Sequence, residues 1–375
     1  AEKLIMLTDD MLSALSNDRI NYDEFLARSK QLVVGTCVGI GQGHIGIADN
    51  TYDWVIVDEA ARSISSELAI AMQVGKRILL VGDQEQLPPL YSEEHKLALA
   101  RKLGIQKRGE ELDQALGSDF ARVFESQYGR KASAILKTQY RMAPPIGTLI
   151  SECFYQGKLE NGKSDADVPP IYDTLPQYFD HTVTWIDTAS LPNAYHEQAK
   201  NGSLSNRAEA DMIISLLENL EQDEHFMQSD VINKCLKEGS QAIGVICMYG
   251  EQKRLVRKRF NEKTWSESFK QLVKIDSVDS YQGKENRIII LSITRHDKKN
   301  SVGFLHLPNR INVALSRAMD RLIIVGVTKL WETVSNKKLP LGKVLSFMKE
   351  NHNRDQGNYQ VISVTQKNTG KRRGR

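Results

Sequence analysis

The stretch GTCVGIGQGHIGIADNTYDWVIVDEA, Gly35–Ala60, indicates the architecture more directly than any other part of the chain. Its first twelve residues hold five glycines, and the apolar run 54–57 then leads directly into Asp58 and Glu59. Apolar residues that do not alternate with polar ones are typical of a parallel strand covered on both faces. Ligands of such sheets bind at the carboxyl ends of the strands, where an Asp can hold Mg²⁺ and a Glu can deprotonate water. The stretch therefore predicts a strand that ends in a candidate metal and acid–base site.

Other parts of the chain repeat this pattern. Similar apolar runs occur at 77–82, 242–248, 287–293 and 321–327. Helical patterns lie between them, the clearest over 204–220, where the apolar residues recur on one face after a capping Ser205 or Asn206. Strands that alternate with helices are typical of parallel α/β sheets. We therefore expect an α/β protein, divided near residue 135 into a smaller first part and a larger second part.

The stretches between these runs are less regular. Residues 91–130 are polar and favour helices, and 250–260 follow a strand and are expected to be helical. Residues 157–203 are rich in loops, although 176–188 add a candidate strand. No repeat of fixed period is present.

Composition sets limits on the class of protein. The chain has 375 residues, 41% of them hydrophobic and 26% charged, which is typical of globular domains. The four cysteines have no paired spacing and the eight histidines form no metal-ligand pattern, so we expect neither disulfides nor a bound transition metal. No apolar run is long enough for a membrane span. We expect a reducing location, the cytoplasm, or the nucleus if the source is eukaryotic.

The net charge of +3 does not by itself indicate a polyanionic partner, but the basic residues are clustered. One cluster lies at 101–108, a second at 253–259, and the segment after Asp355 is basic and free of acids. Each cluster has two interpretations, a solvated surface or a site for nucleic-acid phosphates.

A second strand end strengthens the case for a ligand site. The run RILLVGDQEQLPP, 77–89, leads into Asp83 and then Gln86. Neighbouring parallel strands end at the same edge, so Gln86 is expected close to Asp58. An amide both donates and accepts hydrogen bonds, which suits a sensor of a terminal phosphate.

Five segments then occur in a specific order. They are VIVDEA, LLVGDQEQLPP, LKTQYRMAPPI, SVDSYQGKENRIIILS and NRINVALSRAMDRLIIVG. Together they resemble motifs II to VI of superfamily 1 helicases, in the branch that includes the nonsense-mediated-decay and Okazaki-processing helicases, over residues 33 to 327. The resemblance implies two RecA-like parallel-sheet domains, the first incomplete here, with ATP bound in the cleft between them.

The resemblance also implies a role for each matching residue around ATP and Mg²⁺. Asp58 and Glu59 match the Mg²⁺ residue and the water-activating residue, and Gln86 matches the γ-phosphate sensor. Arg141 and Arg317 match the two arginines that the second domain directs at the phosphates, a task that suits the planar, always charged guanidinium. The remaining nucleotide-binding positions implied by the motifs are Asp83, Gln139, Gly283 and Glu285.

A second set of residues matches the nucleic-acid side of the family. These are Thr36, Pro88, Ser277 and Ser280, and small hydroxyls suit phosphates because they bind without reading sequence. By the same alignment the glycines of 35–46 belong to this side. The expected partner is single-stranded nucleic acid, tracked 5′-to-3′ by resemblance, whereas DNA and RNA are not distinguished.

The phosphate loop of the family raises a separate question. We expect no GxxxxGK[ST] string in the chain, with motif I lying upstream of Ala1. Three explanations are then open: the chain is the C-terminal part of a longer protein, an upstream polypeptide completes the first domain, or this is a degenerate relative. The chain begins AEKLIML without Met, which favours the first.

Function and organisation follow from these expectations. The leading hypothesis is a nucleic-acid-dependent ATPase and helicase, inactive as this chain alone, and the alternative is an ATP-independent nucleic-acid-binding scaffold. The expected domains are a helical insert or end of an upstream region (1–30), a partial first domain (31–135), a second domain (136–345) and a basic tail (346–375).

Overall fold

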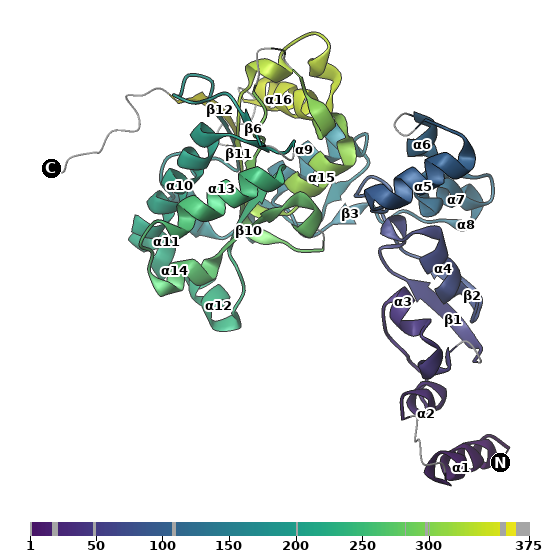
Figure 1. The fold of residues 1–375 in the computed structure, drawn as a ribbon. Helices are drawn as coiled ribbons and strands as arrows, with labels where there is room; N and C mark the ends of the chain where they lie inside the picture. The colour runs from purple at the N-terminus through teal and green to yellow at the C-terminus, as the bar shows by residue number, and fades with distance from the viewer. Residues whose placement is uncertain are drawn as a thin grey trace. The chain divides into compact units, whose positions relative to one another are not determined.

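The computed structural model describes residues 2–16, 22–47, 50–106, 110–199, 202–281, 283–296, 299, 301–352 and 358–364. The chain divides into two compact units, Ala1–Ala134 and Ile135–Arg375, each of which is considered by itself (Figure 1). Within the described residues, none of the helices has the length and apolar character needed to cross a membrane.

The described residues of the first unit form one parallel pair of strands and several helices. Strand β1 (Tyr52–Val57) pairs with β2 (Gly75–Leu80), with Val57 opposite Leu80. The helices are α1 (Glu2–Ser16), α2 (Tyr22–Ser29), α3 (Cys37–Ile40), α4 (Ser65–Met72), α5 (Glu93–Leu103), α6 (Glu110–Ala115), α7 (Asp119–Glu125) and α8 (Gly129–Ala132). The predicted strands at 54–57 and 77–82 and the helical character of 91–130 are confirmed.

One face of this strand pair is buried and the other is exposed. Val57 packs with Leu68 and Ala71 of α4 and with Phe120 of α7. The opposite face carries Trp54, Ile56, Leu79 and Val81, whose exposed fractions are 53%, 64%, 45% and 41%. The sequence pattern predicts cover on both faces, but within the described residues only one face is covered.

The second unit is built on a six-stranded parallel sheet in the order β12-β5-β11-β10-β8-β9. The strands are β5 (Val183–Asp187), β8 (Ile243–Cys247), β9 (Val273–Ser277), β10 (Asn286–Ser292), β11 (Ala318–Val325) and β12 (Tyr359–Ser363). Two small pairs accompany it: β3 (Thr138–Gln139) with β4 (Glu160–Asn161), and β6 (Glu197–Gln198) with β7 (Leu204–Ser205). The α/β class is confirmed, as are the predicted strands of this unit at 242–248, 287–293 and 321–327 and the candidate strand within 176–188.

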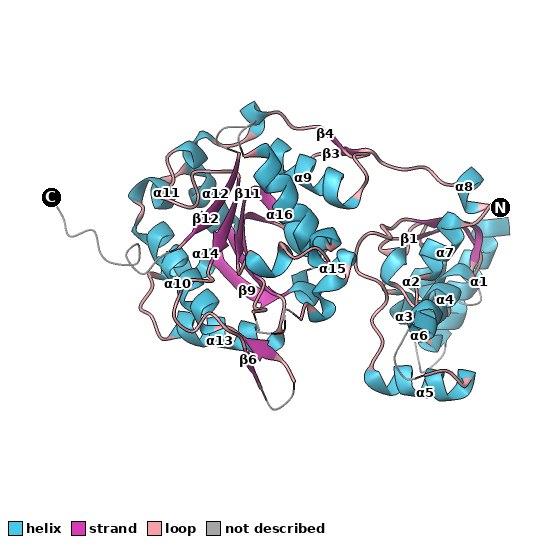
Figure 2. Ribbon diagram, turned by 90° about the horizontal axis from the view of Figure 1, so that it is seen from above, coloured by secondary structure: helices cyan, strands magenta, loops and turns pink. Residues whose placement is uncertain are grey.

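Helices cover both faces of this sheet (Figure 2). Helices α10 (Arg207–Gln222), α11 (Glu224–Gln228), α12 (Asp230–Glu238), α13 (Gly250–Asn261) and α14 (Glu267–Leu272) gather on one side. Helices α9 (Pro144–Phe154), α15 (Pro308–Leu315) and α16 (Pro340–Asn351) lie on the other. Ile288 to Leu291 and Leu322 to Val325 are all 0% exposed, which explains why these strands read as continuous apolar runs.

Helix α10 begins at a capping residue that can be recognised in the sequence. Asn206 stands before its first turn, and its side chain accepts a hydrogen bond from the Glu209 N–H at 3.1 Å. This cap satisfies an amide that has no partner within the helix. The predicted helix over 204–220 is confirmed, with Asn206 as the capping residue.

The expected basic tail from 346 needs correction. Residues up to Asn351 belong to α16, and Tyr359–Ser363 form β12, which pairs with β5 at the edge of the sheet. Apolar residues in this segment, among them Met348 and Tyr359, are buried, so a tail could not begin at 346. The basic residues from 367 onward lie outside the described residues.

Candidate functional site

The first unit presents two carboxylates at the carboxyl edge of β1. Asp58 and Glu59 follow the last residue of the strand, and the Asp58 carboxylate accepts the Glu59 N–H at 2.9 Å. Glu59 has φ 54°, a left-handed conformation that is uncommon for a residue other than glycine. The chain can turn so sharply here because Gly82, after β2, has no Cβ that would lie 2.9 Å from the Ala61 nitrogen. Both acids are exposed.

The neighbouring strand end is organised by Asp83. Its carboxylate accepts hydrogen bonds from the Glu85 N–H and from Gln86 Nε2, each at 2.9 Å. The Asp83 carbonyl also accepts the Gln86 N–H at 3.1 Å, which closes a turn. Burial, assisted by the charges of Asp83 and Glu125, raises the pKa of Glu85. Asp83 and Gln86 therefore follow β2 at the same edge at which Asp58 and Glu59 follow β1.

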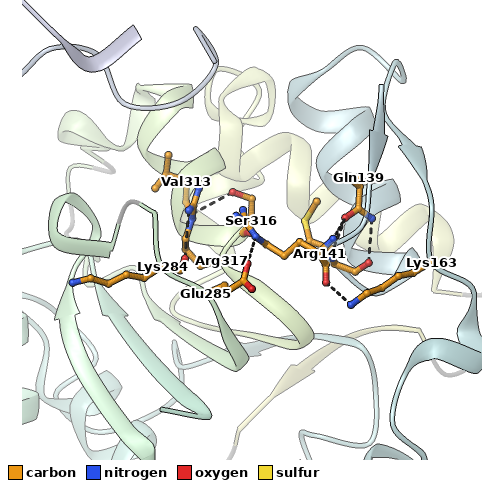
Figure 3. Close-up of polar contacts among 9 residues, drawn as sticks. Gln139, Arg141, Lys163, Lys284, Glu285, Val313, Ser316 and Arg317 are labelled. Atoms are coloured by element: carbon orange, nitrogen blue, oxygen red, sulfur yellow. Dashed lines mark hydrogen bonds and ion pairs between the residues drawn. The ribbon is translucent and has the colours of Figure 1, made fainter. Parts of the chain in front are cut away.

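In the second unit, Gln139 fixes the loop that carries Arg141 (Figure 3). Its side-chain oxygen accepts the N–H groups of Arg141 at 3.0 Å and Met142 at 2.8 Å. Its Nε2 donates to the Met142 carbonyl at 3.1 Å and to Asn161 Oδ1 at 2.8 Å. Gln139 thus holds the backbone of Arg141, and the nucleotide contact that the resemblance implies for Gln139 stays a prediction.

Arg141 itself pairs with Glu285. Its Nε donates to Glu285 Oε2 at 2.5 Å, and its Nη1 lies 3.5 Å from the Ser316 carbonyl (Figure 3). The two side chains are 36% and 45% exposed, so this ion pair contributes no more than ~1 kcal/mol to stability. A partly exposed guanidinium held in one orientation remains available to a phosphate, which matches its planar fork.

Arg317 lies buried within the second unit. It is 1% exposed, its Nε donates to the Val313 carbonyl at 3.1 Å, and its Nη1 to the Lys284 carbonyl at 3.4 Å. The guanidinium binds the backbone next to Glu285 (Figure 3), and the phosphate contact that the resemblance implies for Arg317 stays a prediction. Gly283, with φ +74°, makes the turn before Lys284, in a region of backbone space that glycine adopts readily. Gln282, the residue before Gly283, lies outside the described residues.

The four predicted nucleic-acid residues are divided between the two units. Thr36 caps α3, since its hydroxyl accepts the Gly39 N–H at 3.0 Å. Pro88 is exposed after β2. Ser277 ends β9, and its hydroxyl lies 3.2 Å from that of Ser280. The structure therefore places Thr36 and Pro88 in the first unit and joins the two serines in the second.

A cavity of about 730 Å³ opens beside Ser277, at the carboxyl ends of β8, β9 and β10. Tyr249 and Phe304 lie in its wall with ring centroids 4.5 Å apart. Arg295 Nε donates to the Tyr249 hydroxyl at 2.7 Å, and the Arg310 guanidinium stands 4.9 Å from the Phe304 ring centre. We call this cavity the basic-aromatic groove. Basic side chains beside aromatic rings are typical of surfaces that bind single-stranded nucleic acid.

The sequence did not predict most of this groove. Of its basic residues, only Lys253 belonged to a predicted cluster, and it is paired with Asp276 at 3.3 Å. Tyr249 and Arg295 each lie a few residues after the end of a predicted strand, and that position was the available signal. Arg310 lies in the fifth of the quoted segments, NRINVALSRAMDRLIIVG, although no role was predicted for it, whereas Phe304 lies outside all five segments.

One expectation about the phosphate loop is wrong. Residues Gly157–Ser164 read GKLENGKS and do match GxxxxGK[ST]. A phosphate loop joins a strand to a helix, so that the helix N-terminus faces the phosphates. Here helix α9 precedes the string and a three-residue 3₁₀ helix, Asp165–Asp167, follows it. Lys163 Nζ donates to the Arg141 carbonyl at 2.8 Å.

No transition-metal site was expected. Within the described residues, no three or more His, Cys, Asp or Glu side chains gather as a group that could hold a metal ion.

Comparisons with known proteins agree with the family that the motifs indicate. An AAA domain family matches residues 116–329, and a second AAA domain family matches residues 2–94. The chain is 31% identical over 317 residues to the Regulator of nonsense transcripts 1 homolog of Neurospora crassa, covering 81% of this chain and 25% of that protein. It is 27% identical to the DNA replication ATP-dependent helicase/nuclease DNA2 of Saccharomyces cerevisiae, covering 82% of this chain and 19% of that protein.

Two further similarities are to another curated helicase and to a solved structure. The ATP-dependent helicase upf1 of Schizosaccharomyces pombe is 29% identical, with 81% of this chain and 30% of that protein covered. Among solved structures, the PRRSV helicase has 14% identity and a TM-score of 0.33, over 77% of this chain and 38% of that chain. The chain thus spans between 19% and 30% of the length of these curated relatives. Since one AAA domain family covers more than half of the sequence and the five motifs keep their order, the chain belongs to the superfamily 1 helicases of the Upf1-like family.

Proposed function

We propose that this chain supplies the hydrolytic and strand-binding residues of a nucleic-acid-dependent ATPase that moves 5′-to-3′ along a single strand. The observation that supports this most directly is the pair of adjacent strand ends in the first unit, which bring Asp58, Glu59, Asp83 and Gln86 to one sheet edge. The phosphate loop is proposed to come from polypeptide outside these 375 residues.

The residues at this edge fit Mg²⁺ and ATP. Asp58 and Glu59 are exposed oxygen donors, the ligand type that Mg²⁺ prefers. Bound Mg²⁺ would neutralise phosphate charge, with Asp58 as the residue that holds it. Glu59 would accept a proton from the attacking water, and Gln86, oriented by Asp83, would contact the terminal phosphate. Arg141 of the second unit would stabilise negative charge on the phosphates, and buried Arg317 would support the Lys284–Glu285 turn.

The basic-aromatic groove supports binding of a single strand. Ser277 lines it together with Arg295, Arg310 and Lys299. Cations attract the backbone phosphates, and aromatic faces stack with any base, so such a groove holds a strand without reading its sequence.

The first test uses Glu59→Gln in the protein as its natural gene encodes it. ATP hydrolysis is measured with and without single-stranded DNA and RNA. We expect stimulated hydrolysis to fall by at least ~10²-fold, because glutamine cannot accept the proton. Asp53→Asn is the matched control, since Asp53 is an exposed acid near the opposite end of β1. Unchanged stimulated hydrolysis in Glu59→Gln would refute the role of Glu59, and ATP-independent strand binding without any hydrolysis would favour a scaffold.

The second test measures strand affinity against salt concentration. Arg295→Ala should weaken binding and lower the slope of log K against log salt by ~0.7 for each phosphate that Arg295 neutralises in the parent. Lys349→Ala in α16, which removes a surface cation paired with Glu332, should leave the slope unchanged. Equal slopes in the parent and Arg295→Ala would show that Arg295 does not bind a phosphate of the strand.

A further inference from the structure

We propose that Glu209 is a positioning residue of the basic-aromatic groove, because it holds the Thr294 backbone in the conformation that places Arg295 in the groove wall. This inference rests on the proposed strand-binding role of the groove. Glu209 itself is 0% exposed and is not among the residues that line the cavity, so it acts through its neighbours.

The hydrogen bonds of Glu209 lead away from its own helix. Its Oε2 accepts the Ser292 hydroxyl at 2.6 Å and the Thr294 N–H at 2.7 Å. An acid in the first turn of a helix often accepts the backbone N–H of the capping residue. In this structure the N–H of the capping residue, Asn206, donates to Gln252 Oε1 at 2.7 Å. The Glu209 carboxyl therefore accepts its hydrogen bonds from the end of β10 and the residues that follow it.

Thr294 requires this support. Its φ is 74°, and the left-handed region is a genuine outlier for a β-branched residue. Such a conformation costs ~1–3 kcal/mol and persists only where the surroundings fix it. The Thr294 N–H is held by Glu209, and its carbonyl accepts Asn206 Nδ2 at 3.2 Å. The first turn of α10 and its capping residue thus hold both backbone polar groups of Thr294.

Residues of the groove wall hold the guanidinium end of Arg295. The guanidinium donates to the Tyr249 hydroxyl at 2.7 Å, and its Nη1 donates to the Ser301 carbonyl at 2.7 Å. Gly303 completes this fit, since a Cβ there would lie 2.3 Å from Arg295 Nη2. With its guanidinium held at one end, Arg295 can reach these partners only if the Thr294 backbone directs it toward them.

An acceptor atom, and not a charge, is what this role needs. Burial raises the pKa of Glu209 to about 8, so much of the carboxyl is neutral at neutral pH. Glutamine keeps an oxygen in the place of Oε2 and should retain both hydrogen bonds. Alanine removes the acceptor and leaves the Thr294 N–H buried without its partner.

The experiment is a double-mutant cycle in the natural full-length protein, read as affinity for a labelled single strand. We expect Glu209→Ala to weaken binding about tenfold, Glu209→Gln to bind within about twofold of the parent, and ATP turnover at saturating strand to change less than about twofold. In an Arg295→Ala background, Glu209→Ala should have no further effect, because its influence passes through Arg295. Ser292→Ala, which deletes the other donor to Oε2, is the matched control and should bind as the parent does.

The outcomes separate the two proposals. If Arg295→Ala binds as tightly as the parent, the strand-binding role of Arg295 fails. If Arg295→Ala weakens binding but folded Glu209→Ala does not, or if the two effects add, the positioning role fails while the groove stands. Should Glu209→Ala not fold, Glu209→Asp replaces it, since it withdraws the carboxylate by one methylene. Parent-like affinity in Glu209→Asp, with Arg295→Ala impaired, then overturns the inference.

Discussion

Glu209→Gln should change how the stability of the second unit depends on pH. Burial raises the pKa of the Glu209 carboxyl from 4.5 to about 8, because the charged form loses its water. Hydrogen bonds from Ser292 and from the backbone of Thr294 lower it, but by less than burial raises it. The folded protein therefore keeps this proton to a higher pH than the unfolded chain.

The sign and the magnitude follow from this shift. Below pH 4.5 the carboxyl is protonated in both states, so its contribution to stability is fully present. Between pH 4.5 and about 8 only the unfolded chain releases the proton, and the free energy of unfolding falls as pH rises, by up to ~1.4 kcal/mol per pH unit. The whole rise in pKa corresponds to ~5 kcal/mol, most of which is lost between about pH 5 and pH 8. Burial also raises the pKa of the adjacent Cys247 thiol, which therefore stays uncharged over this range.

The assay is urea denaturation of the parent and of Glu209→Gln at four pH values between about 5 and 8 and at constant ionic strength. Tryptophan fluorescence suits it, because Trp185, Trp265 and Trp331 are all buried in the second unit. Glutamine cannot ionise, so the stability of the variant should fall less than that of the parent as pH rises. Parallel curves would refute the reasoning, as would a parent that gains stability relative to the variant with rising pH.

Two further predictions concern packing and the Arg141 loop. Gly244→Ala should destabilise the second unit by ~1–3 kcal/mol in the same assay, because its Cβ would lie 2.5 Å from the Tyr281 hydroxyl. Gly250→Ala is the control: its Cβ meets nothing nearer than 3.9 Å, so it should destabilise the unit less. Gln139→Ala should lower strand-stimulated ATP turnover of the full-length protein at least ~10-fold, since two backbone N–H groups lose their acceptor. The exposed neighbour Tyr140, changed to Phe, is its control, and equal turnover in the two variants would contradict the role of Gln139.

In the second unit, the strands that could be predicted from the sequence lie inside the sheet. β10 and β11 are buried on both faces, so their residues form continuous apolar runs. β9, with the sequence VKIDS, is an edge strand whose Lys274 and Asp276 are only partly buried, and it carries no such run. β12 at the opposite edge was predicted as tail for the same reason. In this sheet the edge strands bury less surface, so their sequences lack a continuous apolar run.

The candidate site was predictable only where its residues are close in the sequence. Asp58 and Glu59, and likewise Asp83 and Gln86, follow strands directly, so the strand pattern places them. The basic-aromatic groove draws single residues from segments far apart in the chain, and only the folded sheet brings them together. Burial of Arg317 was likewise not predictable, because a sequence motif specifies the residue but not the carbonyls that surround it.

The GKLENGKS string shows why letters alone do not define a phosphate loop. A phosphate loop depends on backbone N–H groups at the start of a helix, but this segment contains the short strand β4 and is followed by a three-residue 3₁₀ helix. Its residues make other hydrogen bonds here. Asn161 Oδ1 accepts a hydrogen bond from Gln139 Nε2, and Lys163 Nζ donates one to the carbonyl of Arg141. Both hydrogen bonds are made to the loop that orients Arg141 toward Glu285. The segment that resembles a phosphate loop therefore supports the arginine proposed to face the phosphates, and its lysine is already engaged in that support.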